Sequence, residues 1–493
     1  MTDAAAPVPD LAGIPASIPA TDPLAPYDAV LLLSYGGPRR PEDVLPFMRN
    51  ATAGRGVPDS RLLEVSGHYQ GFGGASPINA RNAELRDALQ ARLAERGSTL
   101  PVVVGNRNWH PFVSQALREL ADAGARHVLA LPTAAFGSYS GCRQYREDLA
   151  GAAALLAAGA DGSTGDGFEA DAAARVGGEG GAPVDLTVDK TRPYYNTPGL
   201  LEANVDAIVE AYGALAEQGV AAADVRLVLV THSIPLGMEA GSAPLLESDG
   251  ASESAGAGQS AGRPAGPREP GVAADLSTEV SYVAQHRALA AVLVPEVARR
   301  LGLETVEADL VYCSRSGPPQ ARWLEPDVND HLEALAAGQL TDGSPADRPG
   351  GVVVAPFGFI SDHMEVVFDL DTEAAQTARD LGMPYARAAT VGTHPAFVDS
   401  LVDILIERAA VARGEDVHPA STTGVGPFHT VCPPSCCRSG AHHPGQHSHH
   451  GADGAAHESA AGHQLAAGGS CRPASAEPES LKPASCGRMK EKR

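Results

Sequence analysis

The sequence Tyr27-Asp-Ala-Val-Leu-Leu-Leu-Ser-Tyr35-Gly-Gly-Pro38 decides the fold class of this protein. Its apolar run shows no polar alternation and ends at a Gly-Gly-Pro turn, which is typical of a strand buried on both faces of a parallel sheet. Apolar runs at 101–104 and 127–131 predict two more strands, and helical periodicity at 82–96 and 111–123 lies between the predicted strands. Strands that alternate with helices indicate βαβ units and a parallel sheet.

The same order of elements restarts after residue 190. Strands are predicted at 225–231, 308–314 and 351–356, and helices at 199–216, 282–301, 328–337, 361–381 and 397–413. We therefore predict an α/β protein with two doubly wound, Rossmann-like halves, at 27–190 and 191–416. Ligands of such sheets bind outside the carboxyl ends of the strands. The turns Ser34-Tyr35 and Thr231-His232 should therefore face one cleft.

The remaining segments are poor in large apolar residues. Residues 1–26 predict a disordered leader, and stretches rich in Gly, Ala, Ser, Glu and Asp predict flexible insertions at 151–182 and 241–273. Such segments bury too little surface to offset the entropy of ordering. A Cys- and His-rich low-complexity tail follows at 417–493. Its histidines between 442 and 463 either bind metal loosely or belong to a neutral tail, which is the simpler interpretation.

Composition excludes several classes of protein. The net charge is −23, from 37 Lys and Arg against 60 Asp and Glu, whereas nucleic-acid grooves and anionic membrane surfaces need basic partners. The first basic residue is Arg39, so we expect no signal or transit peptide, and no apolar run approaches the ~20 residues of a membrane span. The 7 cysteines then indicate reduced thiols and a cytoplasmic protein.

Two polar patterns near strand ends are candidates for chemistry. Glu365, Asp369 and Glu373 lie four residues apart, so a helix places them on one face. Partly buried carboxylates are costly without a cation or a proton among them, so the row is either a path for a hydrated divalent metal or an exposed acidic stripe. His232 follows the strand at 225–231, where an imidazole either binds metal or accepts a proton, or simply packs in the core.

Five motifs follow one another along the chain. They are Leu-Leu-Leu-Ser-Tyr35-Gly-Gly-Pro; Gly67-His68-Tyr69-Gln-Gly-Phe-Gly-Gly-Ala-Ser76-Pro77-Ile-Asn79; Thr-His232-Ser-Ile-Pro235; Ser314-Arg-Ser-Gly-Pro-Pro with Trp323-Leu-Glu-Pro-Asp327; and Pro356-Phe-Gly-Phe-Ile-Ser-Asp-His363-Met-Glu365. Over about residues 27–413, apart from the two insertions, this series resembles the ferrochelatases, most of all the coproporphyrin-type enzymes of actinobacteria. The resemblance implies a porphyrin cleft between the two halves. It also implies insertion of Fe²⁺ into a porphyrin, with release of two protons, in haem biosynthesis.

The resemblance also implies roles for individual residues. His232 matches the invariant catalytic histidine and Glu365 its partner carboxylate, and both are expected to contact the iron substrate. Asp369 and Glu373 match the acidic track that leads to them. The positions that match porphyrin-binding residues are Tyr35, which can ligate iron from the opposite face, and His68, Tyr69, Ser76 and Tyr145.

One departure from the family concerns the porphyrin propionates. Some relatives carry an arginine near the position of Thr52 that binds a propionate, and this sequence has no arginine at that position. Either Arg49 or Arg55 replaces that arginine, or the propionates lie differently.

The implied reaction needs these types of side chain. A base such as His232 can accept the two pyrrole protons, while Glu365 orients it and offsets its charge. A row of carboxylates suits a hard divalent ion that sheds its water stepwise. A cleft that bends the planar porphyrin brings the bound substrate toward the transition state.

The cysteines form a second group of candidates. Cys432-Pro-Pro-Ser-Cys436-Cys437 lies beyond the last predicted helix. By the same resemblance, these three and Cys142 are expected to hold a [2Fe–2S] cluster, for which four thiolates are the required number. On spacing alone, a Cys₄ zinc site and unliganded thiols stay open. Cys313 lies in a predicted strand and is expected to be core packing.

Two other functions also stay open. One is a chelatase that inserts cobalt or nickel into a different tetrapyrrole; such enzymes often place two histidines over the ring, and here only His363 could join His232. The other is a non-enzymatic haem or metal carrier with the same two-lobed scaffold. Coproporphyrin III is favoured over protoporphyrin IX by the actinobacterial resemblance and by Tyr35. A monomer is expected.

Overall fold

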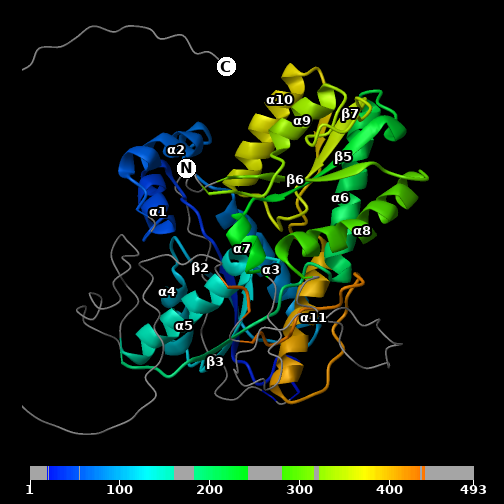
Figure 1. Ribbon diagram of the computed structural model, residues 1–493. Helices are drawn as coiled ribbons and strands as arrows, with labels where there is room; N and C mark the ends of the chain where they lie inside the picture. Colours follow the sequence, from blue (N-terminus) through cyan, green and yellow to red (C-terminus); the bar gives the residue numbers. More distant parts are fainter. Residues whose placement is uncertain are drawn as a thin grey trace, which may run out of the picture. The chain divides into compact units, whose positions relative to one another are not determined.

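The computed structural model describes Pro19 and residues 21–54, 56–159, 182–242, 280–315, 321–433 and 436–438. Within these ranges two four-stranded parallel sheets have the strand orders β2-β1-β3-β4 and β6-β5-β7-β8 (Figure 1). The strands are β1 (Ala29–Ser34), β2 (Val102–Asn106), β3 (His127–Pro132), β4 (Thr187–Lys190), β5 (Val225–His232), β6 (Ala308–Cys313), β7 (Gly351–Ala355) and β8 (Tyr385–Arg387). The predicted α/β class with two Rossmann-like parallel sheets is confirmed.

The central strand of each sheet is apolar along its length because helices cover both of its faces. In β1, Val30 and Leu32 pack into one core cluster and Leu31 and Leu33 into another. In β5, the leucines and valines that alternate along the strand divide between two clusters in the same way. This is the side-chain pattern of a doubly covered parallel strand.

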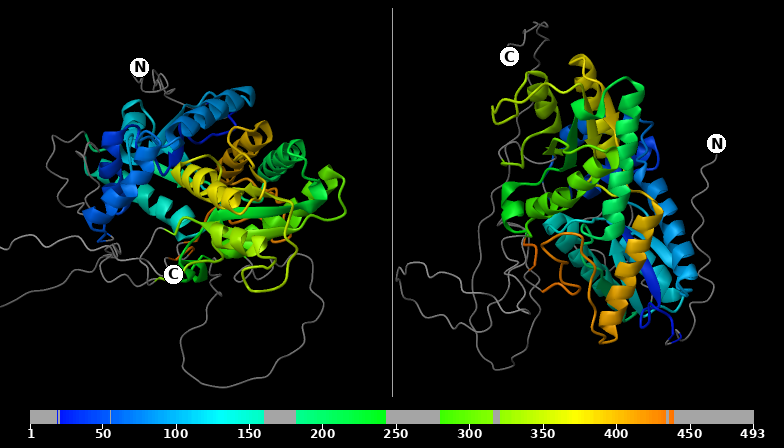
Figure 2. Two further views of the ribbon diagram at one scale, coloured as in Figure 1. Left: turned by 90° about the horizontal axis from the view of Figure 1, so that it is seen from above. Right: turned by 90° about the vertical axis from the view of Figure 1, so that its right-hand side faces the viewer.

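The helices form layers on the two sides of each sheet (Figure 2). Helices α4 (Val113–Asp122) and α5 (Gln144–Ala157) cover one face of the first sheet, and α3 (Ile78–Glu95) covers the other. The second sheet lies between α6 (Pro198–Glu217) and α8 (Tyr282–Leu301) on one face and α9 (Val328–Ala336), η5 (Val366–Ala374) and α10 (Ala375–Asp380) on the other. The shorter helices are η1 (Pro41–Asp43), α1 (Val44–Ala51), α2 (Asp59–Gly71), η2 (Tyr139–Arg143), η4 (Ala222–Asp224) and α7 (Leu236–Ala240). None of the helices in the described ranges has the length and apolar content needed to span a membrane.

The last helix, α11 (Pro395–Ala412), packs against both α3 and α6 (Figure 1). Arg96 Nη2 of the first half donates to Asp403 Oδ1 of α11 at 2.9 Å. The buried Arg192 donates to Glu407 Oε1 of α11 at 2.7 Å. The C-terminal helix, which we placed in the second half, therefore also belongs to the core of the first. The boundaries 27–190 and 191–416 stay predictions.

Ordered packing begins before the expected start at Tyr27. Leu24 is fully buried, and its N–H donates to Asp22 Oδ1 at 2.8 Å. Arg413 donates to the carbonyl of Ala25 at 2.6 Å, so this segment is fixed by the end of α11. The last part of the predicted leader is thus part of the core, while residues 1–18 lie outside the described residues.

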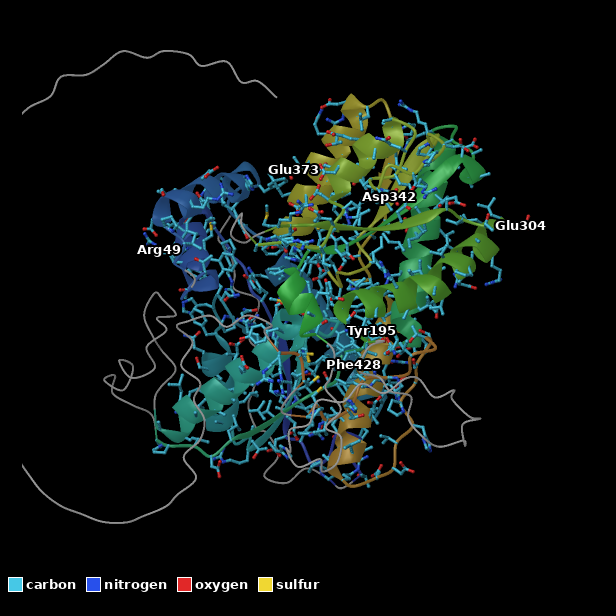
Figure 3. All side chains as sticks on the ribbon, viewed as in Figure 1. Arg49, Tyr195, Glu304, Asp342, Glu373 and Phe428 are labelled. Carbon is cyan, nitrogen blue, oxygen red and sulfur yellow. The ribbon has the colours of Figure 1, made fainter. Side chains whose placement is uncertain are left out.

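The insertions and the tail also differ from the predictions at their margins. Helix α5 extends to Ala157, because Leu156 is buried against the first sheet. Residues 160–181 and 243–279, which include most of the two predicted insertions, lie outside the described residues. The predicted tail begins as a packed segment. Phe428 is buried, and its ring lies edge-on to Tyr195 at 6.2 Å between centroids (Figure 3).

Candidate active site

An imidazole and a carboxylate meet where β5 ends. His232 is the last residue of β5, which lies between β6 and β7, and Glu365 follows the chain that leaves β7. The distance from His232 Nε2 to Glu365 Oε2 is 3.5 Å, and the side chains are 30% and 42% exposed. The Nδ1–H of His232 donates to the carbonyl of Ser233, which directs Nε2 toward Glu365. Both groups are therefore accessible to a ligand.

Each member of this pair favours the charged form of the other. Desolvation lowers the pKa of His232, but attraction to Glu365 and hydrogen bonds to Glu365 and Ser233 outweigh it, so the pKa is raised. Desolvation raises the pKa of Glu365, but His232 and then His363 lower it to a net value of about 2. The pair therefore has a high affinity for one proton, which is held on the imidazole.

The acidic row begins at this pair and continues along η5, which is a π-helix and not the predicted α-helix. Desolvation raises the pKa of Asp369 to about 7; the hydrogen bond from Ser314 opposes this, and the charges of Glu365 and Glu373 add to it. Glu373 is exposed (Figure 3), and partial burial raises its pKa. The row thus runs from an exposed carboxylate through one that titrates near neutrality to an ionised one. π-helices are rare and often occur at functional sites.

The first half contributes an aromatic wall opposite the acidic helix. Tyr35 follows β1 directly and is 40% exposed. The ring of His68 in α2 stacks on Phe368 of η5 at 4.0 Å between centroids and 10° between planes. Desolvation raises the pKa of Tyr69, and the charge of Glu365 adds to the rise. Two segments far apart in sequence therefore meet here, one from each half.

Two other predicted porphyrin contacts lie deeper than the wall. Ser76 is buried beneath Gly37, where an added Cβ would come within 2.7 Å of Ser76 Cβ, so only glycine allows this close turn. Tyr145 is buried, with the Arg107 guanidinium 4.7 Å from its ring centroid; the same guanidinium is 5.9 Å from the ring of Tyr35. Their roles as porphyrin contacts stay predictions.

The two arginines expected near the propionates have different outcomes. Arg49 Nη2 lies 2.5 Å from Asp59 Oδ2 on the exposed surface of α1 and α2. Arg55 lies outside the described residues. Arg49 would therefore have to exchange its partner to bind a propionate.

The four cysteines expected to act together lie together. Cys142 in η2 forms one buried cluster with Cys432, Cys436 and Cys437, and all four line one small cavity with Arg143, Arg146 and Lys190. Lys190 Nζ lies 3.3 Å from Cys142 Sγ, and Cys436 Sγ lies 3.6 Å from Cys437 Sγ. Hydrogen bonds from Cys432 and Cys437 lower the pKa of Cys142 well below its usual range. The four thiols are therefore surrounded by cationic side chains, which stabilise the thiolate form that binds metal.

The profile of the family described as Ferrochelatase matches residues 27–409. The chain belongs to the ferrochelatase family. The coproporphyrin III ferrochelatase of Streptomyces coelicolor is 42% identical to it over 422 residues, which cover 85% of this chain and 96% of that protein. The coproporphyrin III ferrochelatase of Streptomyces griseus is 43% identical over 413 residues, 84% of this chain and 94% of that protein. Among solved structures, SirB from Bacillus subtilis with Fe³⁺ aligns with a TM-score of 0.38 at 12% identity, over 78% of this chain and 97% of that chain.

Family membership confirms the predicted class of enzyme, a metal chelatase, and accounts for the order of the five motifs. In this ferrochelatase, three side chains near the sites were not predicted: Ser314, which donates to Asp369; Arg107, which contacts Tyr35; and Lys190, which donates to Cys142. Each contact joins residues far apart in sequence. Only Ser314 left a signal in the sequence, because it belongs to one of the five motifs; in the structure it adopts a positive φ of 63°.

His363, the further histidine considered from the sequence, lies beside the ferrochelatase pair. Its Nδ1 is 3.9 Å from Glu365 Oε2, so Glu365 faces two imidazoles. Within the ranges that the structure describes, no three or more His, Cys, Asp or Glu side chains are arranged to hold a metal ion.

Cys313, two further cysteines near the end of the sequence and the histidines of the tail lie apart from the four expected cluster ligands in the sequence. Cys313 is buried in the core of the second half, as expected, and burial raises its pKa. Cys471, Cys486 and the histidines of 442–463 lie outside the described residues.

Proposed function

We propose that this ferrochelatase inserts Fe²⁺ into coproporphyrin III in preference to protoporphyrin IX, as a step of haem biosynthesis, and works as a cytoplasmic monomer. The observation that carries the proposal is the His232–Glu365 pair, with atoms 3.5 Å apart, opposite the aromatic wall of the first half. The relatives that carry the name coproporphyrin III ferrochelatase support this porphyrin.

The acidic row supplies the path for the iron substrate. Hydrated Fe²⁺ first meets the exposed Glu373, then Asp369, and reaches Glu365, whose carboxylate stays ionised. Carboxylate oxygens exchange with the water ligands of a hard divalent ion one at a time. A dication that arrives beside Glu365 also lowers the pKa of His232, because its positive charge disfavours the imidazolium form.

His232 then serves as the base for the porphyrin. Its proton leaves to solvent as the iron arrives, and the free Nε2 accepts a pyrrole proton; a second cycle removes the other. The balance is one porphyrin with two N–H groups and one Fe²⁺ giving iron porphyrin and two protons. Glu365 stabilises each imidazolium as it forms. Tyr35 and Tyr69 line the opposite face of the porphyrin.

An anaerobic assay with both porphyrins side by side tests this proposal. We expect His232→Ala to lose iron insertion while it still binds porphyrin, because the base is lost and the wall is intact. The matched control is His418→Ala, in the segment after α11, which should keep wild-type turnover. Near-normal turnover in His232→Ala would refute the assigned base. Porphyrin binding without any turnover in the wild type would instead indicate a carrier.

We also propose that the four clustered cysteines hold a [2Fe–2S] cluster. The proposal is supported by four thiols around one cavity, with a lysine 3.3 Å from Cys142 Sγ. A two-iron cluster needs two thiolates on each iron and not three donors around one ion. Such a cluster would be held by Cys142 of η2 and by Cys432, Cys436 and Cys437 of the C-terminal segment, and would supply one-electron redox chemistry.

Spectroscopy of anaerobically purified protein tests the cluster. We expect iron–sulfur absorption bands and acid-labile sulfide in the wild type and in Cys313→Ser, whose thiol lies in the core of the second half. Cys142→Ser should lose both signals. Bound zinc without labile sulfide would establish the Cys₄ zinc alternative, and neither metal would mean free thiols.

A further inference from the structure

The side chain of Tyr282, at the start of α8, reaches the backbone of His232. Its hydroxyl lies 3.1 Å from the His232 carbonyl oxygen and 2.8 Å from Thr231 Oγ1. Tyr282 is buried, and burial raises its pKa well above the usual range. The hydroxyl therefore stays protonated and can donate a hydrogen bond at any working pH.

A buried histidine fixes the direction of these hydrogen bonds. His286 Nδ1 lies 2.7 Å from the Tyr282 carbonyl oxygen, which can only accept, so Nδ1 carries the hydrogen. Nε2 must then accept, and its partner is the Thr231 hydroxyl at 2.8 Å. Because the Thr231 hydroxyl donates its only hydrogen to His286, Tyr282 is the donor toward both of its neighbours, and its single hydrogen is shared between Thr231 Oγ1 and the His232 carbonyl oxygen. Burial lowers the pKa of His286 to about 3, which keeps the ring neutral.

Independent contacts hold His286 and Thr231 in place. The ring of His286 stacks on Phe136 of the first half at 3.7 Å between centroids. A Cβ at Gly358 would come within 2.1 Å of Thr231 Oγ1, so the backbone after β7 packs closely against this hydroxyl, and only glycine fits there. Thr231 therefore has little room to move when a neighbour changes.

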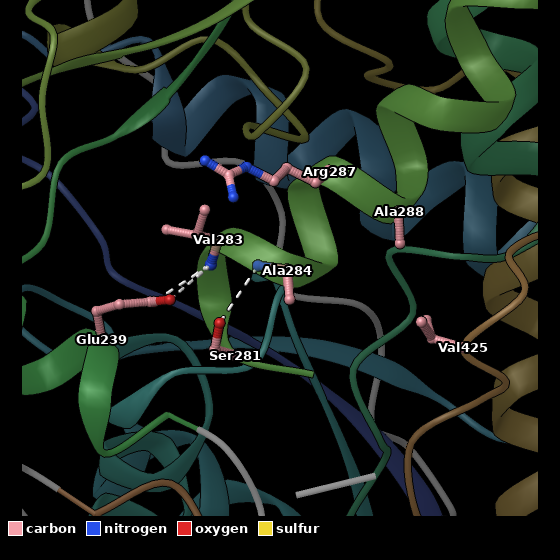
Figure 4. A pocket seen from close by; sticks show the side chains of 7 residues that line it. All are labelled: Glu239, Ser281, Val283, Ala284, Arg287, Ala288 and Val425. Carbon is pink, nitrogen blue, oxygen red and sulfur yellow. Dashed lines mark hydrogen bonds between the residues drawn. The ribbon is translucent and has the colours of Figure 1, made fainter. Parts of the chain in front are cut away.

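The first turn of α8 is also anchored. The N–H of Tyr282 donates to Ser242 Oγ at 2.8 Å, and the N–H of Val283 donates to both carboxylate oxygens of Glu239. Figure 4 shows Glu239 of α7 and Ser281 bonded to this turn, on the wall of a cavity of about 550 Å³. Because α7 follows the His232 turn, residues 232–242 and the start of α8 form a closed ring of contacts.

We propose that Tyr282 is a positioning residue that fixes His232 through its carbonyl group. The inference rests on the proposed function, in which His232 is the base. The hydrogen bond holds the last peptide unit of β5, from which the imidazole projects toward Glu365. Tyr282 is buried and reaches His232 only through its backbone, so we expect it to contact neither the porphyrin nor the iron. Its loss should therefore lower kcat and leave the KM values for porphyrin and iron unchanged, since a misplaced base slows only the chemical step.

The test compares two Tyr→Phe variants of the full chain. Tyr282→Phe should lower kcat about tenfold, the effect of losing one buried hydrogen bond that matters in the transition state. Tyr212→Phe is the matched control, because within the described residues the buried hydroxyl of Tyr212 has no hydrogen-bond partner. It should keep the wild-type kcat. The inference would be overturned if kcat of Tyr282→Phe stayed within twofold of wild type. It would also be overturned if the loss appeared as a rise in KM and not as a fall in kcat.

Thr231→Val separates positioning from a general structural role. This change leaves His286 Nε2 without its partner but frees Tyr282 to donate wholly to His232. We expect a larger drop in melting temperature than in Tyr282→Phe and a smaller loss of kcat. Losses of kcat that follow the melting temperatures across the variants would overturn the inference. If His232→Ala stays active, the proposed function fails; if it is inactive while Tyr282→Phe is normal, only this inference fails.

Discussion

His232 Nε2 and Glu365 Oε2 lie 3.5 Å apart, although 133 positions separate the two residues in the sequence. The strand order β6-β5-β7-β8 explains the contact, because β5 and β7 are neighbours and the chain leaving β7 returns over the end of β5. The pair shares one proton between an imidazole of raised pKa and a carboxylate of lowered pKa. Its charge state therefore responds to any cation that approaches Glu365.

Removal of the Glu365 charge should impair the enzyme without unfolding it. Glu365→Gln keeps the shape of the side chain but loses the stabilisation of the imidazolium, so we expect a drop in turnover of about 100-fold. Steady-state assays with Fe²⁺ and coproporphyrin III measure this. Glu333→Gln, at an exposed position of α9, is the control. Turnover of Glu365→Gln within twofold of wild type would remove Glu365 from the mechanism.

The pKa of Asp369, about 7, predicts a pH dependence for iron uptake. The carboxyl is protonated below that pH and ionised above it, so kcat/KM for Fe²⁺ should rise as the pH passes upward through about 7. The Ser314 hydroxyl lowers this pKa by donating to the carboxylate. Ser314→Ala should therefore move the rise to higher pH, and Asp369→Asn should abolish it. The same pH profile in wild type and Asp369→Asn would assign the titration to another group.

The longer strands could be predicted from the sequence, whereas the short edge strands β4 and β8 could not. The apolar runs of β1 and β5 are long enough to be recognised, because a central parallel strand must be apolar on both faces. Strands β4 and β8 have four and three residues, with Asp189, Lys190 and Arg387 among them. Such strands form because a neighbouring strand offers hydrogen bonds, which their own sequence does not reveal. Helix α2 was missed because Leu62 is its one buried residue, so its sequence lacks a clear apolar stripe.

The site likewise has features that the sequence indicates and features that depend on contacts between distant segments. The four-residue spacing of Glu365, Asp369 and Glu373 indicates a helix, but it does not distinguish an α-helix from the π-helix that forms. The resemblance to a family points to His232 and Glu365. The residues that support the two sites, Tyr282 beside His232 and Lys190 beside Cys142, arise from contacts between distant segments and have no local pattern.

Lys190 should raise the reduction potential of the proposed cluster. Its ammonium group lies 3.3 Å from Cys142 Sγ, and a nearby positive charge favours the more negative, reduced state. Lys190→Gln should therefore shift the midpoint potential downward, while Lys190→Arg keeps the charge and should stay close to wild type. Redox titration followed by visible absorption measures the shift. An unchanged potential in Lys190→Gln would mean that solvent or the nearby arginines screen the lysine.

Asp309 predicts a pH-dependent contribution to stability. It accepts two hydrogen bonds from Arg226, at 2.6 and 2.8 Å, and lies 3.0 Å from His331 Nε2. Desolvation raises its pKa, but these partners outweigh that effect and lower it to about 2. A carboxylate with a lowered pKa stabilises the folded state above its unfolded pKa of about 3.9, and this contribution is lost as the pH falls through the folded pKa.

Asp309→Asn should therefore lower the free energy of unfolding at pH 7 by about 2 kcal/mol, since two charge-assisted hydrogen bonds are weakened. Urea titrations of the full chain between pH 7 and pH 2 measure the difference from wild type. The difference in free energy of unfolding should be constant down to about pH 4. It should then become smaller, because protonation of Asp309 removes from the wild type the charge that the variant lacks. Glu304→Gln, at an exposed position (Figure 3), should change little at any pH. A difference that stays constant to the lowest pH would mean that the shape of Asp309, and not its charge, carries the stability.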